Sequence, residues 1–245
     1  MSTTTSEASA VAVVLVHGAF ADSSSWNGVI ERLQASGIRV TAPANQLRGI
    51  AHDSAYLASY LEQIPGPVVV VGHSYGGALI SNAGNAANVV GLVFVAAYAP
   101  EDGERLGDVG DTSKDSILGP TLVPLKYPHA NGSGVEFTVD AAKFREAFAA
   151  DLSAEQSSLM AATQRPVADA AFSEPCGPPA WTSTPSWAVV ATADKAAGTD
   201  VIRSMAERAG ATITEVDASH VVMVSQPEVV AEVIRTAVAA VAVGS

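Results

Sequence analysis

The chain has 245 residues, of which 48% are hydrophobic and 16% are charged, so it is too apolar to be disordered and long enough to bury a large core. Acidic residues outnumber basic ones by 25 to 13, and the net charge of −12 argues against the basic surface that a nucleic-acid partner needs. A single cysteine, Cys176, excludes an intramolecular disulfide and a cysteine-rich metal site. The five histidines show no metal-ligand spacing, so we expect neither a metal nor a cofactor.

The two ends of the sequence carry no pattern typical of membrane insertion. Residues 1–10 are polar and contain an acidic residue but no Lys or Arg, and we expect them to form a flexible N-terminus. The apolar run Val11–Val16 is too short for a signal sequence or a membrane span. Charged residues interrupt Val229–Val243, which favours an amphipathic helix. We therefore expect a cytoplasmic protein with no membrane partner, while a secreted form whose leader has been removed stays open.

From residue 11 onward, short runs of β-branched residues alternate with helix-like segments. The apolar runs are continuous rather than alternating, which is typical of strands that are covered on both faces in a parallel sheet. This order predicts an α/β fold, with a mostly parallel sheet and helices on both faces. In the first part of the chain the predicted strands are Val11–Val16, Arg39–Ala42, Val68–Val71 and Val89–Ala97, and the predicted helices are Trp26–Ala35, Asp53–Gln63 and Ala78–Ala83.

The alternation stops at Pro100. Residues 100–184 contain no strand run comparable with the earlier ones, and they hold two helix-like segments, Asp140–Asp151 and Ala154–Thr163. The alternation then resumes with the strands Trp187–Ala191 and Ala211–Val216 and the helices Asp200–Arg208 and Pro227–Val241.

This interruption predicts two parts of the molecule. Residues 11–99 and 185–245 form the α/β core, and residues 100–184 form a helical cap inserted into it. An insertion of this length in an α/β sheet usually covers the carboxyl ends of the strands, where such folds bind their ligands. We therefore expect the cap to lie over the functional site.

The most informative motif is Gly72-His73-Ser74-Tyr75-Gly76. It is a G-x-S-x-G sequence that lies between a predicted strand and a predicted helix, and this context is typical of a serine nucleophile on a strained turn. The turn would lift the Ser74 hydroxyl above the sheet, near a helix N-terminus where negative charge is favoured. A chance Gly/Ser turn is the alternative reading, but it does not account for the apolar strand and the helix on either side.

A serine hydroxyl needs a base to take its proton, and in this type of site the partners follow in the order serine, acid, histidine. His220 follows the last predicted strand and is the candidate base, while Asp194 follows the strand before it and is the candidate acid. Glu101 and Asp102 also follow a strand and remain an alternative for the acid.

Two backbone amides are expected to stabilise the oxyanion. One belongs to Tyr75, the residue after the candidate nucleophile, and the other to Ala19, in the loop that follows the first strand. His17 and His73 adjoin these positions, and we expect both to be structural rather than catalytic.

These residues resemble the α/β-hydrolase superfamily from about residue 11 to residue 240. Val14–Ala19 followed by Trp26, Phe94–Pro100 and Ser219-His220 look like the small branch that contains plant methylesterases, hydroxynitrile lyases and bacterial esterase relatives. The resemblance implies an α/β-hydrolase fold with the cap inserted after the equivalent of the sixth strand. It also implies that Ser74 is the nucleophile, Asp194 the acid and His220 the base. The oxyanion donors would be the amides of Ala19 and Tyr75.

The sequence departs from the lyases of this branch at two positions. The lyases have a threonine after the first-strand histidine and a lysine after the catalytic histidine, where this chain has Gly18 and Val221. The resemblance therefore does not imply cyanohydrin cleavage. A serine at position 74 also argues against the epoxide hydrolases and dehalogenases, which use a carboxylate there.

The motifs together predict a serine hydrolase that cleaves small, mostly apolar carboxylic esters. We expect Phe20, Phe144 and Met160 to contribute to its substrate pocket, although helical spacing indicates that most apolar cap residues serve for packing. Two alternatives stay open: the same site could serve lactone opening, C–C cleavage or cofactor-free peroxidase-like chemistry, or the protein could bind a ligand with little turnover. The sequence does not indicate an oligomeric state.

Overall fold

The computed structural model describes residues 10–129 and 132–242, and its centre is a six-stranded sheet in which every pair of neighbouring strands is parallel. Its order is β2-β1-β3-β4-β8-β9, so the chain reverses its direction of winding once, at β1. The predicted parallel α/β sheet is thereby confirmed. The strands are β1 (Ala12–Val16), β2 (Arg39–Thr41), β3 (Val68–His73), β4 (Val89–Val95), β8 (Ser186–Ala191) and β9 (Thr212–Val216).

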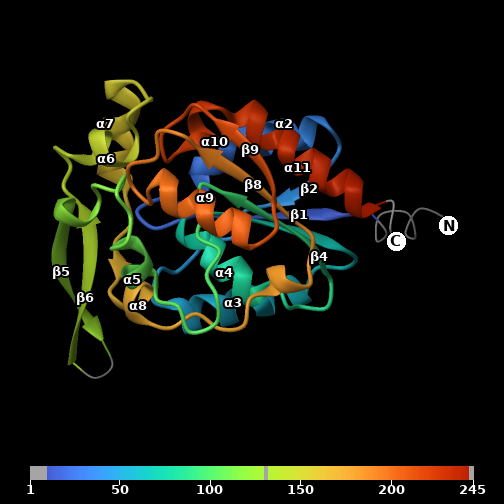
Figure 1. Ribbon diagram of the computed structural model, residues 1–245, viewed down its shortest axis with the longest axis horizontal. Helices are drawn as coiled ribbons and strands as arrows, with labels where there is room; N and C mark the ends of the chain where they lie inside the picture. Colours follow the sequence, from blue (N-terminus) through green and yellow to red (C-terminus); the bar gives the residue numbers. More distant parts are fainter. Residues whose placement is uncertain (1–9, 130–131, 243–245) are drawn as a thin grey trace.

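Helices cover both faces of this sheet, as Figure 1 shows. On one face α2 (Asn27–Ala35) packs against α11 (Pro227–Ala242), and on the other α3 (Ile50–Glu62) packs against α4 (Tyr75–Ala83). The remaining core helices are α9 (Thr199–Arg208) and α10 (Val222–Ser225), together with the 3₁₀ helix Ser23–Trp26. Because the strands are covered on both sides, every residue of β1, β3 and β8 is buried, which explains their continuous apolar runs. Within the described ranges, no helix is both long and apolar enough to cross a membrane.

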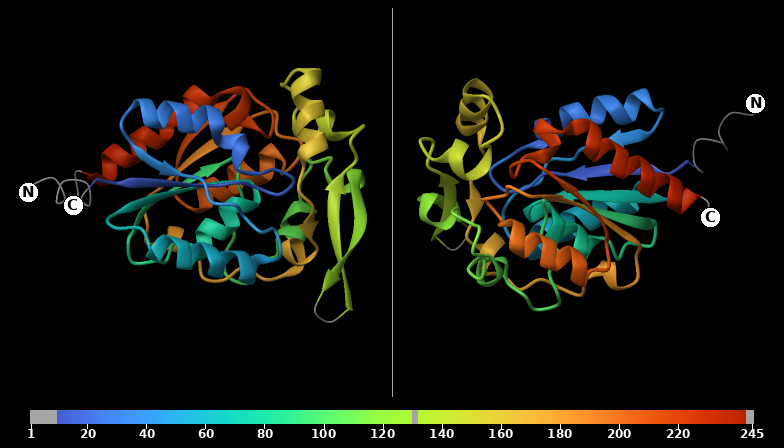
Figure 2. Two further views of the ribbon diagram at one scale, coloured as in Figure 1. Left: turned by 180° about the vertical axis from the view of Figure 1, so that it is seen from behind. Right: turned by 45° about the horizontal axis from the view of Figure 1, so that its top comes forward.

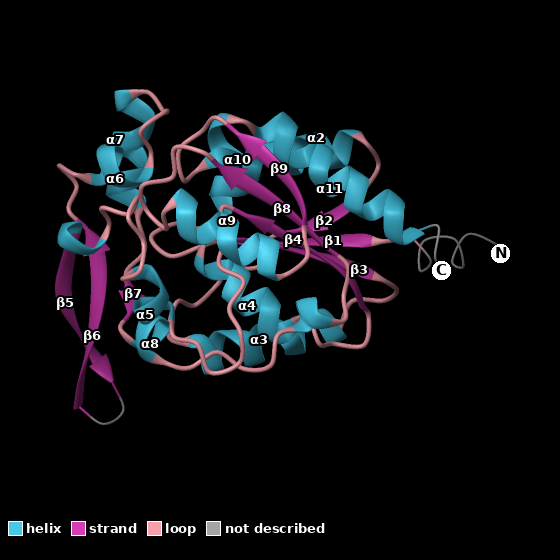
Figure 3. Cartoon of the chain, viewed as in Figure 1, coloured by secondary structure: helices cyan, strands magenta, loops and turns pink. Residues whose placement is uncertain are grey.

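Residues 100–184 lie mainly at one end of the sheet, opposite the end where β1 begins and α11 finishes (Figure 2). The prediction of a helical cap was wrong, because the cap contains strands as well as helices. It contains a three-stranded sheet in the order β5-β6-β7, and Figure 3 shows its β5–β6 hairpin standing apart from the main sheet. Its strands are β5 (Leu122–His129), β6 (Gly132–Val139) and β7 (Val167–Ala168).

The sequence hides this hairpin for two physical reasons. An antiparallel hairpin exposes much of its surface, so most residues of β5 and β6 are exposed or half-buried and form no continuous apolar run. Pro124 and Pro128 also lie within β5, and proline is tolerated there because β5 is an edge strand. One predicted cap helix is shorter than expected, since only five residues of Asp140–Asp151 form α6.

The helices of this segment are α5 (Leu106–Gly110), α6 (Phe144–Phe148), α7 (Ala154–Thr163) and α8 (Ala170–Ser173), with 3₁₀ helices at Gly119–Thr121 and Ala180–Thr182. The predicted helix Ala154–Thr163 is α7. Its N-terminus is stabilised by a capping box, in which the Ser153 hydroxyl accepts a hydrogen bond from the Gln156 amide N–H while the Gln156 side chain accepts one from the Ser153 N–H.

The parallel order brings the candidate site residues to one edge of the main sheet. Ser74 follows β3, Asp194 comes three residues after β8, and His220 comes four residues after β9. The loop that contains Ala19 follows β1, the immediate neighbour of β3. Since all four strands run in the same direction, their carboxyl ends lie at the same edge, where α/β sheets bind ligands.

Candidate active site

Ser74 occupies a sharp turn between β3 and α4. Its backbone has φ 52° and ψ −121°, a conformation that is strained for any residue with a side chain. The glycines of the motif allow this turn because other backbone passes close to them. A Cβ at Gly72 would lie 2.5 Å from the carbonyl oxygen of Gly76, and one at Gly76 would lie 2.6 Å from that of Val16. The predicted strand–turn–helix context of the motif is thus present.

Asp194 and His220 form a buried hydrogen-bonded pair. The Asp194 Oδ2 lies 2.7 Å from the His220 Nδ1, and both residues are 1% exposed. The other carboxylate oxygen, Oδ1, accepts hydrogen bonds from the amides of Ala196 at 2.8 Å and Ala197 at 3.0 Å. Because an ionised carboxylate can only accept, Nδ1 of the imidazole carries the proton in this pair, and Nε2 is left as the basic nitrogen.

His73 connects this pair to the turn that carries Ser74. Its Nε2 donates a hydrogen bond of 3.0 Å to the carbonyl oxygen of His220, and the centres of the two imidazole rings are 4.6 Å apart. Burial, reinforced by the neighbouring His220, lowers the pKa of His73 well below its usual value, so this ring is neutral. Among the described residues the Ser74 hydroxyl makes no hydrogen bond with His220, and such a contact often tightens only when substrate binds.

The alternative acids lie elsewhere. Glu101 has a side chain that is 54% exposed and forms an ion pair of 3.6 Å with Arg208. Asp102 is also exposed, as is Asp217, which precedes His220 along the chain. Of the carboxylates considered, the structure brings Asp194 to the histidine.

The two expected oxyanion donors flank Ser74. A Cβ at Gly18 would lie 2.8 Å from the Ser74 Cβ, so the loop that precedes Ala19 packs directly against the turn that carries Ser74. Within the part of the chain that the structure describes, the backbone N–H groups of Ala19 and Tyr75 donate no hydrogen bond. The Tyr75 N–H is also the first of α4, where unpaired amides favour negative charge. Both amides therefore have the unpaired N–H that an oxyanion donor requires.

His17 holds the first of these loops and is not available as a base. It is fully buried, its Nδ1 donates a hydrogen bond of 3.0 Å to the Gly18 carbonyl, and its Nε2 accepts one of 2.9 Å from the Asn45 amide. Burial lowers the pKa of His17 to about 4, so the ring is neutral at ordinary pH. Arg165 of the cap donates to the Asn45 carbonyl at 2.9 Å, which links this loop to the cap.

A pocket of about 590 Å³ lies between the cap and the core, and Ser74, Asp194 and His220 are not among the residues that line it. Two of its lining residues contact the site directly: the Tyr98 amide donates to the Ser74 carbonyl at 3.2 Å, and the Ala196 amide donates to Asp194. Its walls are mixed, because apolar side chains share them with Ser113, Ser116 and the carboxylates of Asp111 and Asp169. The principal apolar lining residues are Tyr98, Leu106, Leu118, Leu122, Phe137 and Phe172.

The pocket residues predicted from the sequence occupy different places. Phe20 and Met160 line a second, smaller pocket of about 110 Å³, and the Phe20 ring also stacks on Phe172 with centres 6.5 Å apart. Phe144 is fully buried and contacts Phe148, whose ring centre is 4.9 Å from that of His220. Sequence reasoning missed Phe172, which lies on a four-residue helix with no distinctive pattern.

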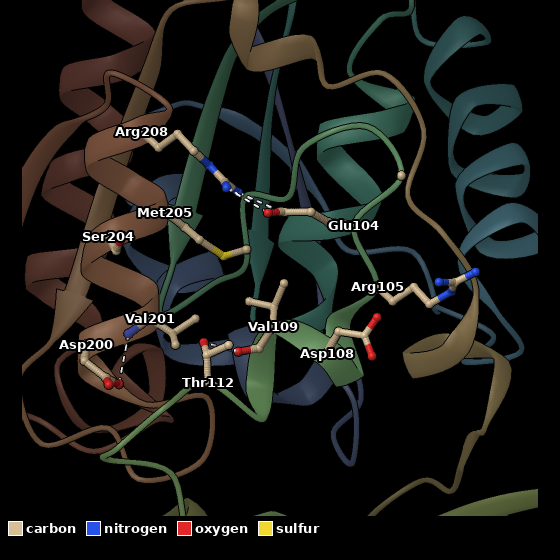
Figure 4. Close-up of a pocket in the computed structure, with 11 residues that line it drawn as sticks. Glu104, Arg105, Asp108, Val109, Thr112, Asp200, Val201, Ser204, Met205 and Arg208 are labelled. Atoms are coloured by element: carbon tan, nitrogen blue, oxygen red, sulfur yellow. Dashed lines mark hydrogen bonds and ion pairs between the residues drawn. The ribbon is translucent and has the colours of Figure 1, made fainter.

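A further pocket, of about 490 Å³, lies between α5 and α9 and contains no candidate site residue (Figure 4). Glu104 and Arg208 face one another across it and form hydrogen bonds of 2.7 and 2.8 Å (Figure 4). Because its central charges neutralise one another, we do not assign this pocket to the reaction.

The decisive observation is that a strained serine, a buried Asp–His pair and two unpaired amides meet at the carboxyl edge of a parallel sheet. A sequence model described as the alpha/beta hydrolase family matches residues 13–233. The chain belongs to the alpha/beta hydrolase family. The resemblance noted from the sequence motifs is thereby confirmed at the level of the superfamily. A comparison with the sequences of curated proteins gives no significant match.

Several solved structures share the fold of the chain over nearly its whole length. A pyrethroid hydrolase from Sphingobium faniae JZ-2 is 22% identical, with a TM-score of 0.76, 94% of this chain covered and 98% of that one. Polyneuridine aldehyde esterase is 20% identical, with a TM-score of 0.77 and coverage of 93% and 98%. An extracellular α/β-hydrolase from a Paenibacillus species, described as a structural and functional homologue of tobacco salicylic acid binding protein 2, is 19% identical, with a TM-score of 0.70 and coverage of 93% and 98%.

Proposed function

We propose that this alpha/beta hydrolase is a serine esterase that cleaves uncharged carboxylic esters with a bulky apolar part. The observation that carries the proposal is the buried hydrogen bond of 2.7 Å between Asp194 and His220, beside a serine held at φ 52°. A strained serine with an oriented imidazole nearby is the arrangement that nucleophilic catalysis on an acyl group requires.

In the first half of the reaction the Ser74 Oγ attacks the ester carbonyl carbon while His220 Nε2 takes the hydroxyl proton. The carbonyl π electrons move onto oxygen, and the resulting oxyanion accepts hydrogen bonds from the Ala19 and Tyr75 amides. Asp194 holds the imidazole in the required tautomer and stabilises the imidazolium. When the tetrahedral intermediate collapses, the C–O bond to the alcohol breaks, and the imidazolium gives its proton to the departing oxygen.

In the second half water takes the place of the alcohol. His220 removes a proton from the water, whose oxygen attacks the acyl carbon and forms a second oxyanion between the same two amides. Collapse of this intermediate breaks the bond to the Ser74 Oγ, which recovers its proton from His220. The products are a carboxylic acid and an alcohol, and the enzyme returns to its starting state.

The pocket between the cap and the core supports the substrate class. Its volume of about 590 Å³ is suited to a drug-sized apolar group, and Phe137 and Phe172 offer aromatic surface for contact. The carboxylates of Asp111 and Asp169 line the same pocket, and the chain has a net charge of −12. Both features disfavour substrates that carry a negative charge.

Turnover of p-nitrophenyl esters from acetate to octanoate, together with the benzoate, tests the proposal. We expect Ser74→Ala to lower kcat/KM by at least about 10⁴-fold, as in other serine triads, and to abolish labelling by a fluorophosphonate. Ser36→Ala is the matched control, because its exposed hydroxyl only binds the Arg32 carbonyl at the end of α2. Labelling that persists in Ser74→Ala would assign the nucleophile to another residue.

A further inference from the structure

Asp53 is a buried carboxylate that the proposed reaction does not use. It lies on α3 and is 2% exposed, yet among the described residues no Lys or Arg side chain forms an ion pair with it. Three donors compensate for its burial: the Tyr75 hydroxyl donates to Oδ2 at 2.9 Å, the Arg48 amide to both oxygens at 2.9 and 3.2 Å, and the Gly49 amide to Oδ2 at 3.4 Å. Burial raises the pKa of Asp53, while these hydrogen bonds act in the opposite direction.

Tyr75 connects this carboxylate to the oxyanion site. It follows Ser74 directly, begins α4 and is 1% exposed, and its N–H is one of the two expected oxyanion donors. Burial and the adjacent Asp53 raise the pKa of the Tyr75 hydroxyl well above its usual value, so this group is the donor in the pair. One residue thus carries the amide that faces the substrate and a side chain fixed to the neighbouring helix.

The backbone at this point needs such support. Ser74 is held at φ 52°, and a strained conformation persists only where the surrounding structure determines it. Leu47, next to Arg48, also has a positive φ of 59°, so the loop that supplies the other donors to Asp53 is strained as well. A buried carboxylate is costly unless hydrogen bonds satisfy it, so Asp53 and the donors around it hold one another in a single geometry.

We propose that Asp53 is a positioning residue for the esterase reaction, which holds the Tyr75 amide in the oxyanion site through the Tyr75 hydroxyl. Asp53 touches no reacting atom, and this inference rests on the proposed function. An oxyanion donor contributes about 10²–10³-fold to kcat. Loosening the donor without removing it should lower kcat by about 10-fold and leave KM within about twofold, because the developing oxyanion depends on the amide far more than the neutral ester does.

The test compares Tyr75→Phe, Asp53→Asn and the double variant on p-nitrophenyl acetate. Titration with a fluorophosphonate counts active sites, so that a loss of folded protein does not change the kcat obtained per site. Tyr60→Phe is the matched control, because Tyr60 lies half-buried on the same helix and its hydroxyl has no hydrogen bond with any described residue. We expect Tyr75→Phe and Asp53→Asn each to lose about 10-fold in kcat and Tyr60→Phe to lose nothing. The kcat of the double variant should equal that of the single variant with the lower kcat.

A second measurement separates positioning from stability. Inhibition by a phenyl trifluoromethyl ketone, which forms a tetrahedral adduct with the serine, should weaken in Tyr75→Phe by the same factor as kcat/KM falls. If Asp53→Asn does not fold, the kcat and the inhibition of Tyr75→Phe alone test the inference. Unchanged kcat and unchanged inhibition in Tyr75→Phe, or additive losses in the double variant, would overturn the inference. Failure of the proposed function is recognised separately, because Ser74→Ala would then retain its turnover.

Discussion

The core and the cap differ in how they hold their residues in place. In the core, β1 and β3 are buried along their full length, and the candidate catalytic groups follow strand ends. In the cap, most residues of β5 and β6 are exposed or half-buried, and Leu122 and Phe137 line a pocket, although Phe144 and Phe148 are buried. Chemistry needs atoms fixed to a fraction of an ångström, whereas an apolar wall tolerates small displacements. The difference suggests that the core sets the rate and the cap sets the choice of substrate.

The two parts nevertheless meet at His220, the candidate base. The Phe148 ring of the cap packs 4.9 Å from His220, and Ser219, the residue before it, donates a hydrogen bond to Asp151 of the cap. Arg165 of the cap also reaches Asn45, which holds the loop before Ala19. Substitutions in the core and in the cap therefore test whether the core alone sets the rate and the cap alone sets the choice of substrate.

After Ser74→Ala, the largest effect in the core is expected at Asp194. Asp194→Asn keeps the shape of the side chain but removes its charge and allows the wrong imidazole tautomer. In a serine-protease triad this change lowers kcat by about 10⁴-fold, and we expect a loss of at least about 10²-fold here, measured as kcat/KM on p-nitrophenyl acetate.

The alternative acids supply the controls for this measurement. Glu101→Gln and Asp102→Asn should change kcat/KM by less than about twofold, because exposed charges away from the imidazole act on it weakly. A nearly normal Asp194→Asn beside a strongly impaired Glu101→Gln or Asp102→Asn would move the acid to the end of β4 and contradict the assignment.

A second prediction concerns the burial of the core. The pKa of His17 is lowered from 6.5 to about 4, so below pH 6.5 the unfolded chain takes up a proton there that the folded protein does not. Folding stability therefore decreases as the pH falls from 6.5 toward 4, and the His17 contribution between pH 7 and pH 5 is about 2 kcal/mol. Urea unfolding of the parent and of His17→Gln at both pH values measures it.

The neutral glutamine should make the loss between pH 7 and pH 5 smaller by that amount, while the other titrating groups act equally in both proteins. His52→Gln serves as the control, because His52 is exposed on α3 and its replacement should leave the difference unchanged. Equal losses in the parent and in His17→Gln would show that the loop around His17 opens to water, and the contrast between core and cap would weaken.

Much of the core could be predicted from the sequence because its signals are local. The run Val11–Val16 gave β1 to within one residue, and the glycines around Ser74 indicated the turn before any contact was known. Asp194 and His220 could be proposed because they follow strands, and parallel strands bring their ends together. Their catalytic roles stay predictions, although the geometry now favours Asp194 over Glu101.

The rest depends on contacts that a sequence does not display. The β5–β6 hairpin lacks an apolar run, because it is half exposed and carries two prolines. The stacking of Phe20 on Phe172 joins residues from the first loop and from the cap, so no local sequence pattern predicts it. The Tyr75–Asp53 hydrogen bond spans 22 positions between two helices and appears only when these helices pack.

The smallest predicted effect tests whether the cap chooses the substrate. Phe137 lines the large pocket from β6 and packs against Phe172, with ring centres 6.4 Å apart. Phe137→Ala removes apolar contact from the acyl or alcohol group without touching the triad. We expect kcat/KM for p-nitrophenyl octanoate or benzoate to change by about 10-fold relative to the acetate, since one or two lost methylene-sized contacts amount to about 1–3 kcal/mol.

Val135→Ala is the matched control, because Val135 lies on the same strand, is 43% exposed and is outside the pocket. If both variants keep the parent's preference, the substrate binds elsewhere; if Phe137→Ala slows every ester equally, the cap contributes to the rate as well, and the contrast with the core fails.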